Sequence, residues 1–372
     1  MRAFARPCFL ALLVAAVVVV AGCASNDDPV SPGPTGPGPR TYRMGFSGIP
    51  PRPDLGQAIA AIQMWAARSD GAIFHTAPPW DSLLAGVRPD TLLMRNEKPL
   101  ADYFHALGLD VVVTLDPTDG LNRAAEAPAL VAAGRSLTEP AVQALYRAYA
   151  VAADTLLRPS HLGLAAETNL IRAAASPALY AAVVAVANDA AADVRAHDAL
   201  VRLNVSVQVE VAWNRLGSPA PGPPTYGSVA TDRADFPFAQ DFGLSSYPFL
   251  AGFSQPEDVP LDYFARVRDE LGTPVLIVEG GWTSATVGGI VSDPQKQARW
   301  WRRQFALADR AQVVGLYQLT FTDLDLATFP PQPPGSILPL FAQLGLVTAD
   351  LAPKPALAVW DSAFVRTLSG GF

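Results

Sequence analysis

"PVLIVEGGWTS" (residues 274–284) is the stretch that decides the fold of this chain. Four apolar residues run directly into Glu279, and two glycines and Trp282 follow. A short apolar run without polar alternation is typical of a strand that is buried on both faces, as in a parallel sheet. Burying a carboxylate is costly unless it has partners. The stretch therefore indicates a buried parallel strand whose end carries a chemically active group.

Seven further short apolar runs have strand character, at 42–48, 71–76, 110–116, 161–167, 203–209, 241–247 and 313–320. The clearest segments with helical spacing lie at 54–69, 138–157, 176–198, 259–271, 293–309 and 354–368. This alternation predicts an α/β fold with parallel strands and right-handed crossovers, and eight strands close a single (β/α)₈ TIM barrel. An open doubly wound sheet is the weaker alternative, because no strand is followed by a glycine-rich phosphate loop.

A processing segment precedes the predicted barrel. Arg2 and Arg6 flank the start of an apolar stretch, 9–21, that is shorter than a bilayer-spanning helix. The stretch ends in Val-Ala-Gly-Cys (20–23), which resembles the bacterial lipoprotein lipobox. This resemblance implies cleavage before Cys23 and lipidation of Cys23. An ordinary secretory signal with an incidental cysteine is the alternative.

The predicted domain organisation follows from this segment. We expect a signal peptide at 1–22, a disordered Pro/Gly-rich tether at 23–40 and one barrel at 41–372. Positions 24 and 25 are Ala and Ser rather than Asp, so no inner-membrane retention signal is present. We therefore expect an extracytoplasmic protein that a lipid anchors to the bacterial outer membrane.

Composition excludes several classes of function. The net charge of -7 argues against a nucleic-acid partner. Of two cysteines, only Cys23 would remain after cleavage, which leaves neither a disulfide nor a cysteine metal site. The four histidines include no His-x-His pair, and no serine lies in a GxSxG elbow, so metal-dependent and serine hydrolases are disfavoured. We expect a monomer with no cofactor.

Two glutamates stand at strand ends. Glu167 ends the fourth predicted strand and Glu279 ends the seventh, so the two would face each other across a barrel mouth. Opposed carboxyl groups suit glycosidic cleavage: one donates a proton to the leaving oxygen and the other attacks the anomeric carbon, with retention when they lie about 5–5.5 Å apart. A salt bridge or helix cap is the simpler reading of either glutamate alone. Together they predict a retaining glycoside hydrolase.

Four segments resemble glycoside hydrolase clan A: "GLAAETN" (163–169), "LSSYPF" (244–249), "PVLIVEGGWTS" and "GLVTADLAPKPALAVWDS" (345–362). Within the clan, the chain looks most similar to the arabinogalactan endo-β-1,4-galactanase group (family 53), whose sixth strand also ends in Ser-Tyr-Pro. The resemblance implies that Glu167 is the acid/base and Glu279 the nucleophile. It also implies that Tyr247 donates a hydrogen bond to Glu279, and that the substrate is a β-linked polysaccharide or oligosaccharide.

The chain also departs from the pattern of that clan. Ala166 stands where an Asn that binds the sugar usually precedes the acid/base. The second strand gives Phe74 and His75 where an Arg is frequent, and 318–321 lack the frequent tryptophan platform. These departures keep a second function open, a non-catalytic glycan-binding surface lipoprotein on a degenerate glycosidase barrel.

Six further side chains are candidates for substrate binding: Trp282, Asn169, His75, Trp213, Trp80 and Asp116. The tryptophans lie beyond predicted strand ends and could stack on sugar rings, although each could instead belong to a loop core. The histidine ends the second strand and should face the pocket. The aspartate could bond sugar hydroxyls, bind a structural calcium ion or simply form a solvated turn.

Overall fold

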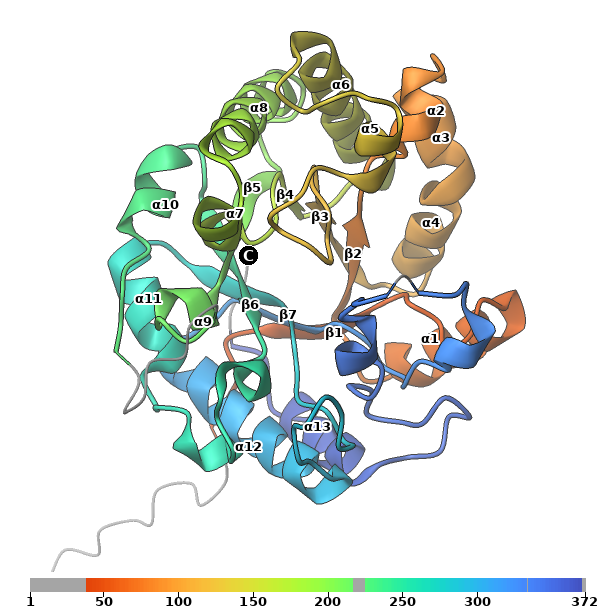
Figure 1. The fold of residues 1–372 in the computed structure, drawn as a ribbon. Coiled ribbons are helices and arrows are strands. Elements are labelled where there is room, and N and C mark those ends of the chain that lie inside the picture. The colour runs from red at the N-terminus through yellow and green to blue at the C-terminus, as the bar shows by residue number, and fades with distance from the viewer. Residues whose placement is uncertain (1–37, 217–224, 333, 370–372) are drawn as a thin grey trace, which may run out of the picture. The chain divides into compact units, whose positions relative to one another are not determined.

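The computed structural model describes residues 38–216, 225–332 and 334–369. Eight parallel strands pair in chain order and close into a barrel (Figure 1). They are β1 (Arg43–Ser47), β2 (Gly71–Thr76), β3 (Asp110–Leu115), β4 (His161–Gly163), β5 (Arg202–Gln208), β6 (Asp241–Ser246), β7 (Val275–Gly280) and β8 (Gly315–Gln318). The predicted (β/α)₈ barrel is confirmed.

Helices form the outer layer of this barrel (Figure 1). The α-helices are α1 (Leu55–Ala66), α2 (Trp80–Leu84), α3 (Pro89–Asn96), α4 (Lys98–Ala106), α5 (Pro128–Ala132), α6 (Pro140–Leu157), α7 (Thr168–Ala174), α8 (Pro177–His197), α9 (Val209–Ala212), α10 (Ala230–Asp235), α11 (Tyr263–Leu271), α12 (Pro294–Ala311) and α13 (Pro355–Phe364). Four short 3₁₀-helices lie in the loops after β6 and β8: η1 (Pro248–Ala251), η2 (Pro256–Asp258), η3 (Leu326–Thr328) and η4 (Leu338–Phe341).

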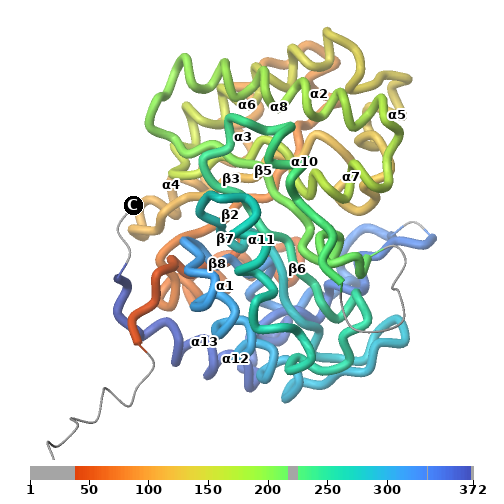
Figure 2. Tube along the Cα trace, turned by 90° about the vertical axis from the view of Figure 1, so that its left-hand side faces the viewer, coloured from red at the N-terminus to blue at the C-terminus, as the bar shows by residue number. Residues whose placement is uncertain are grey.

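The long helices begin where the sequence supplies a cap. Ser176 accepts a hydrogen bond from the Leu179 amide at the start of α8, and Asp293 does the same for the Lys296 amide at the start of α12. Both caps are followed directly by proline, whose fixed φ suits the first helical position. Helices α12 and α13 then run side by side along one flank of the barrel (Figure 2).

The core has two layers. A large apolar layer separates the strands from the helices and includes Trp300, Trp301 and Trp360, each 0% exposed. Trp301 and Trp360 meet edge to face with ring centroids 5.0 Å apart. A smaller cluster around Tyr317 fills the barrel interior. Burial of each large apolar side chain contributes about 1.5–3 kcal/mol, so the outer layer holds the helices to the barrel.

The folded unit begins at Gly38, slightly before the predicted boundary at 41. Arg40 is 3% exposed, forms an ion pair with Asp70 at 2.6 Å, and bonds through its amide to the Thr367 carbonyl. It therefore closes the end of the barrel opposite the strand C-termini. The predicted signal peptide, Cys23 and the rest of the tether lie outside the described residues.

Helix α8 is long and apolar enough to span a membrane by length and composition. It packs against α6 and buries eight residues of its apolar face in the barrel. The apolarity of α8 is thus explained by its place in the helical layer.

Candidate active site

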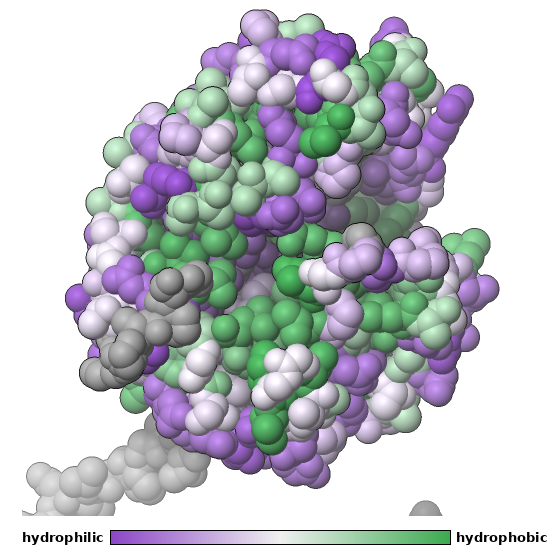
Figure 3. Space-filling view, viewed as in Figure 1, coloured by the Kyte–Doolittle hydropathy of each residue, from purple (hydrophilic) through white to green (hydrophobic). Residues whose placement is uncertain are grey.

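A cavity of about 760 Å³ opens at the C-terminal ends of the strands, where Figure 3 shows a central hollow. Its lining comes from the ends of all eight strands and the loops that follow them. Among these residues are five that the sequence predicted, namely Glu167, Glu279, Tyr247, His75 and Asp116. These five residues are spread over positions 75 to 279 of the sequence, and the fold brings them together at the end of the barrel where such folds bind ligands.

A β-bulge in β7 brings Glu279 into the cavity. Ile277 packs outward among the helices and Val278 packs inside the barrel, so strict alternation would send Glu279 outward again. The register shifts at this point. Ile277 lies opposite Leu244 of β6, but the next residue of β6, Ser245, lies opposite Glu279. Because Val278 is the extra residue, both it and Glu279 line the cavity.

The two glycines after Glu279 are required by close backbone contacts. Gly280 has φ 158° and Gly281 has φ 142°, values that other residues rarely adopt. A Cβ on Gly280 would lie 2.6 Å from the Ser246 carbonyl oxygen, and one on Gly281 would lie 2.8 Å from the side-chain amide of Gln318. The glycines therefore allow β7 to pass closely between β6 and β8 just beyond the carboxylate.

Glu167 reaches the cavity through a strained backbone. Its φ and ψ are 50° and 47°, a left-handed conformation that costs a non-glycine residue on the order of 1–3 kcal/mol. Its amide donates to the Ser206 hydroxyl at 2.8 Å, and helix α7 begins at the next residue. This turn shortens β4 relative to the predicted strand and leaves the Glu167 side chain 9% exposed at the cavity.

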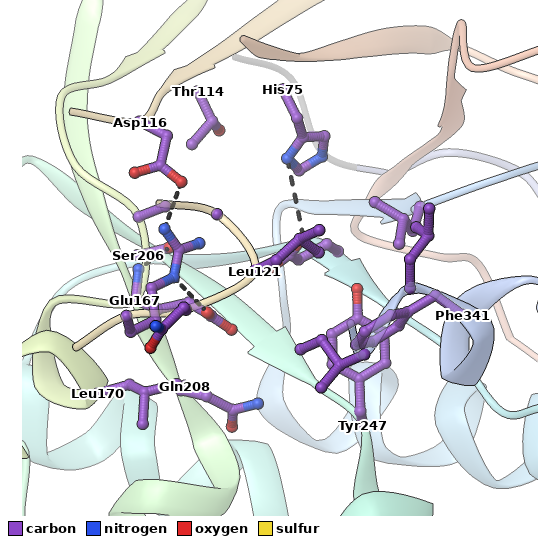
Figure 4. Close-up of a pocket in the computed structure, with 18 of the residues that line it drawn as sticks. His75, Thr114, Asp116, Leu121, Glu167, Leu170, Ser206, Gln208, Tyr247 and Phe341 are labelled. Atoms are coloured by element: carbon purple, nitrogen blue, oxygen red, sulfur yellow. Dashed lines mark hydrogen bonds and ion pairs between the residues drawn. The ribbon is translucent and has the colours of Figure 1, made fainter. Parts of the chain in front are cut away.

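Arg123 is a site residue that the sequence did not reveal. Its Nε donates to Glu167 Oε2 at 2.9 Å, and its Nη1 pairs with Asp116 (Figure 4). The Arg123 side chain is 9% exposed, so both ion pairs are largely shielded from water. It lies in an irregular loop eight residues after β3, where no periodic pattern marks it.

Asp116 forms a turn, as one of the readings of the sequence had it, and it also pairs with an arginine that the sequence did not reveal. Besides its pairing with Arg123, it accepts a hydrogen bond from the Thr118 amide at 3.0 Å, which forms the turn after β3. In the part of the chain that the structure describes, no three His, Cys, Asp or Glu side chains are grouped to hold a metal ion. Asp116 therefore positions Arg123.

Electrostatics in the cavity are dominated by burial. Burial raises the pKa of Glu167 to about 7, although the Arg123 guanidinium opposes this shift. Burial also raises the pKa of Glu279, again against Arg123. The negative charge of Glu279 further raises the pKa of Glu167, so the two carboxyl groups are close enough to titrate as a pair.

Two neutral polar groups lie beside Glu279. Burial raises the pKa of Tyr247 well above its ordinary value, and its hydroxyl keeps its proton while facing Glu279. Burial lowers the pKa of His75 to about 4, so its imidazole is neutral near pH 7. His75 Nδ1 lies 3.9 Å from Glu279 Oε2, which is a contact between a neutral ring and a carboxyl group rather than an ion pair (Figure 4).

The predicted role of Trp282 as a sugar platform is corrected by its position. Trp282 is 1% exposed and does not line the cavity. Its ring packs between Phe249 and Trp300, with centroid distances of 5.9 and 5.5 Å, and its Nε1 donates to Ser292 Oγ. The ring lies in the helical layer, so Trp282 is a core residue.

Trp213, Trp80 and Asn169 are also placed away from the cavity lining. Trp213 stacks on Tyr263 and donates its Nε1 to the Tyr263 carbonyl oxygen at 3.0 Å. Trp80 is 2% exposed within the core. Asn169 exchanges two hydrogen bonds with the backbone of Gln208, which joins α7 to β5. All three side chains have structural partners, which corrects their predicted roles as sugar ligands.

Glu210 is a second residue that the sequence did not reveal. It is 0% exposed behind the cavity and accepts hydrogen bonds from Ser246 Oγ at 2.8 Å, the Tyr247 amide at 3.1 Å and the Tyr263 hydroxyl at 3.1 Å. Burial raises the pKa of Glu210 to about 7. Glu210 therefore fixes the backbone from which Tyr247 reaches Glu279.

The chain shares its fold with solved structures to which its sequence is only distantly similar. No family model and no curated protein matches this chain. Among solved structures, it is similar to an exo-β-1,4-mannosidase from Opitutaceae bacterium strain TAV5, with 17% identity and a TM-score of 0.63 over 89% of this chain. A GH5_18 protein from Streptomyces cattleya in complex with Manβ1-4GlcNAc has 18% identity and a TM-score of 0.59, over 89% of this chain and 83% of that one.

A further similar structure is the GH53 catalytic domain of Ignisphaera aggregans, with 12% identity and a TM-score of 0.56 over 87% of this chain and 91% of that domain. The chain spans only 60% of the mannosidase and about half of several β-glucuronidases that it also resembles. These structures are glycoside hydrolases, and the predicted resemblance to the barrel fold of clan A is confirmed.

Proposed function

We propose that this chain is a retaining glycoside hydrolase that cleaves a β-linked sugar by double displacement. One observation carries the proposal: two buried carboxyl groups, one in the turn after β4 and one in β7, interact electrostatically in one cavity. The glycoside hydrolases of similar fold support it. Glu167 is the acid/base and Glu279 is the nucleophile.

In the first step, a Glu279 oxygen bonds to the anomeric carbon as the bond to the leaving oxygen breaks. Glu167 gives its proton to that oxygen, and a glycosyl ester forms on Glu279. In the second step, water attacks the anomeric carbon, Glu167 takes up the proton of the water, and the ester bond breaks. One water molecule is consumed and the configuration is retained.

The protonation states suit this assignment. Because the two carboxyl groups titrate together in a buried site, their electrostatics favour one shared proton near neutral pH. A pKa of about 7 leaves much of Glu167 protonated. The Tyr247 hydroxyl faces Glu279 and stabilises its ionised form, as a nucleophile requires.

The test uses Glu167→Ala and Glu279→Ala with a panel of alkyl and dinitrophenyl β-glycosides. We expect Glu279→Ala to lose turnover of all of them. Glu167→Ala should lose about 10²–10⁴-fold on alkyl glycosides, but less on dinitrophenyl glycosides, whose leaving oxygen needs no proton. A 2-deoxy-2-fluoro glycoside should label the peptide that contains Glu279. Hydrolysis that survives both substitutions would contradict the proposal.

A non-catalytic glycan-binding function is the second candidate. It is favoured by Ala166 in the lining and by the Arg123 ion pair, which opposes protonation of Glu167. Calorimetry would detect sugar binding by the wild-type chain, and long incubations would yield no reducing sugar. Any product formation that depends on Glu279 would exclude this candidate.

We also propose that Cys23 carries a lipid and anchors an extracytoplasmic enzyme to the outer membrane. Expression in a bacterial host with labelled palmitate should place the label on the wild-type chain and not on Cys23→Ala, which cannot accept the lipid. A wild-type chain that carries no label would refute the lipid anchor.

A further inference from the structure

The cavity has a polar floor and an apolar rim. We define the polar floor as the groups at the strand ends, which include His75, Thr114, Ser206 and Gln208 around the two glutamates. We define the apolar rim as six side chains on the loops that follow: Leu121, Leu170, Leu216, Leu250, Ile337 and Leu338. Figure 3 shows this apolar surface around the hollow. The floor offers hydrogen-bonding groups for a sugar, and the six rim side chains offer none.

Part of the apolar rim is exposed to water. Leu121 is 42% exposed and Ile337 is 39% exposed, on opposite loops of the mouth after β3 and β8. Contiguous apolar surface beside a cavity is a mark of ligand binding, because water leaves it favourably when a ligand arrives. The rim is therefore suited to an apolar part of the ligand.

Features that would bind a sugar chain are scarce along the described cavity. A polymer needs aromatic faces for successive rings, yet no tryptophan contributes to the lining that the structure describes. The Tyr247 ring is itself packed against the edge of Phe341, with centroids 5.0 Å apart. Beyond the polar floor, the surface is mainly aliphatic.

The position of Glu167 identifies the side on which the leaving group lies. A general acid must touch the leaving oxygen, so residues around Glu167 border the leaving group. Leu170 stands one turn later on α7, where its amide bonds to the Glu167 carbonyl. Leu121 stands two residues before Arg123, whose guanidinium holds the Glu167 carboxylate. The leaving group therefore departs along the apolar rim.

We propose that the substrate is a β-glycoside of a single sugar with an apolar, alkyl-like aglycone. The sugar occupies the polar floor and the aglycone lies against the apolar rim. This inference deepens the proposed function and rests on it for the assignment of the leaving-group side. It replaces the polysaccharide that the sequence suggested with a smaller, amphipathic substrate.

Binding to the Glu279→Ala protein tests the ligand class without turnover. The probes are methyl, butyl and octyl β-glycosides of glucose, galactose and mannose, each below its micellar concentration, measured by calorimetry. Affinity should rise by up to about fourfold for each buried methylene, so one octyl glycoside should bind at least about 100-fold more tightly than its methyl counterpart. Equal affinities, or affinity that instead rises with the length of a β-1,4-oligosaccharide, would overturn the inference.

A double substitution on the apolar rim tests whether the alkyl chain binds there. Leu121→Ser with Ile337→Ser should reduce the dependence of affinity on the length of the alkyl chain. Both side chains are already partly exposed, so the fold should tolerate them. Leu200→Ser is the matched control, because Leu200 is 89% exposed in the loop before β5, at the other end of the barrel. An equal loss in the control would contradict a role for the rim.

Turnover by the wild-type chain separates this inference from the proposed function. If octyl glycosides bind but none is hydrolysed, the hydrolase assignment fails and the ligand class stands. If oligosaccharides are cleaved and octyl glycosides are not, the hydrolase assignment stands and the substrate class fails. A glycosyl diacylglycerol in phosphatidylcholine vesicles distinguishes the source: release of diacylglycerol indicates a membrane lipid, and cleavage confined to dissolved octyl glycosides indicates a soluble apolar glycoside.

Discussion

Arg123→Met removes the only guanidinium that contacts Glu167 in the described structure, and its main effect should be on the pH dependence of catalysis. Arg123 Nε lies 2.9 Å from Glu167 Oε2, and both side chains are 9% exposed. Loss of a neighbouring arginine raises the pKa of a carboxyl group by about 1–3 units. The pKa of Glu167, about 7 with the arginine present, should therefore rise.

The sign of the effect follows from the role of Glu167 as an acid. The protonated form is active, so kcat/KM falls as the pH rises through the Glu167 pKa, and a higher pKa moves this alkaline limb to higher pH. Arg123 also lowers the pKa of Glu279, so the acid limb should move in the same direction. The assay is kcat/KM for an alkyl β-glycoside from about pH 4 to pH 10, because an alkoxide leaving group needs the proton.

Two variants control for damage to the fold. Breaking a buried ion pair costs about 3–5 kcal/mol, so unfolding is measured beside activity. Arg123→Lys keeps the charge and should keep the limbs near their wild-type positions. Arg40→Met breaks the buried Arg40–Asp70 pair at the other end of the barrel, and should lower stability without moving either limb. If the alkaline limb of Arg123→Met stays in place or moves to lower pH, Glu167 is not the catalytic acid.

Three further outcomes are expected elsewhere in the barrel. Glu210→Gln should lower kcat with little change in KM, because an amide cannot accept all three hydrogen bonds that hold Tyr247; an equal rise in KM would count against positioning. Lys354→Met should cost about 3–5 kcal/mol of unfolding free energy by leaving Asp323 buried and unpaired, and the double variant with Asp323→Leu should recover most of it in denaturant titrations; if it recovers nothing, the pair is not the cause. The stability of the wild-type chain relative to Glu210→Gln should fall by roughly 3 kcal/mol between about pH 4.5 and 7, because the folded pKa of Glu210 lies near 7 and its stabilising protonation is lost as the pH rises through that value; a difference in unfolding free energy that grows over this range would contradict it.

Much of the architecture was predictable because strand and helix patterns are local. Each apolar run of strand length found a place in the barrel, and the two glutamates followed from their positions at strand ends. Such features depend on periodicity, which a sequence displays directly.

The remaining parts of the site depend on geometry that has no local signature. A tryptophan just after a strand gives the same sequence pattern whether its ring faces the cavity or the helices. The Trp282 ring packs among the helices, which its position in the sequence does not indicate. Arg123 reaches Glu167 only because the Asp116 turn folds its loop back over the barrel. The pattern of apolar residues in β7 does not indicate the bulge at Val278, because this residue is apolar like the residues before it.

That bulge decides which way the proposed nucleophile points. If Val278 took its place in an even pleat, with no extra residue, Glu279 would alternate outward toward the helices, as Ile277 does. Deleting Val278 would instead place Glu279 directly after the outward-facing Ile277 and opposite Ser245, so the carboxylate would keep its direction into the cavity. In this barrel, the difference between a hydrolase and an inert scaffold can therefore lie in the pleating of one strand, without any change to the acidic residues themselves.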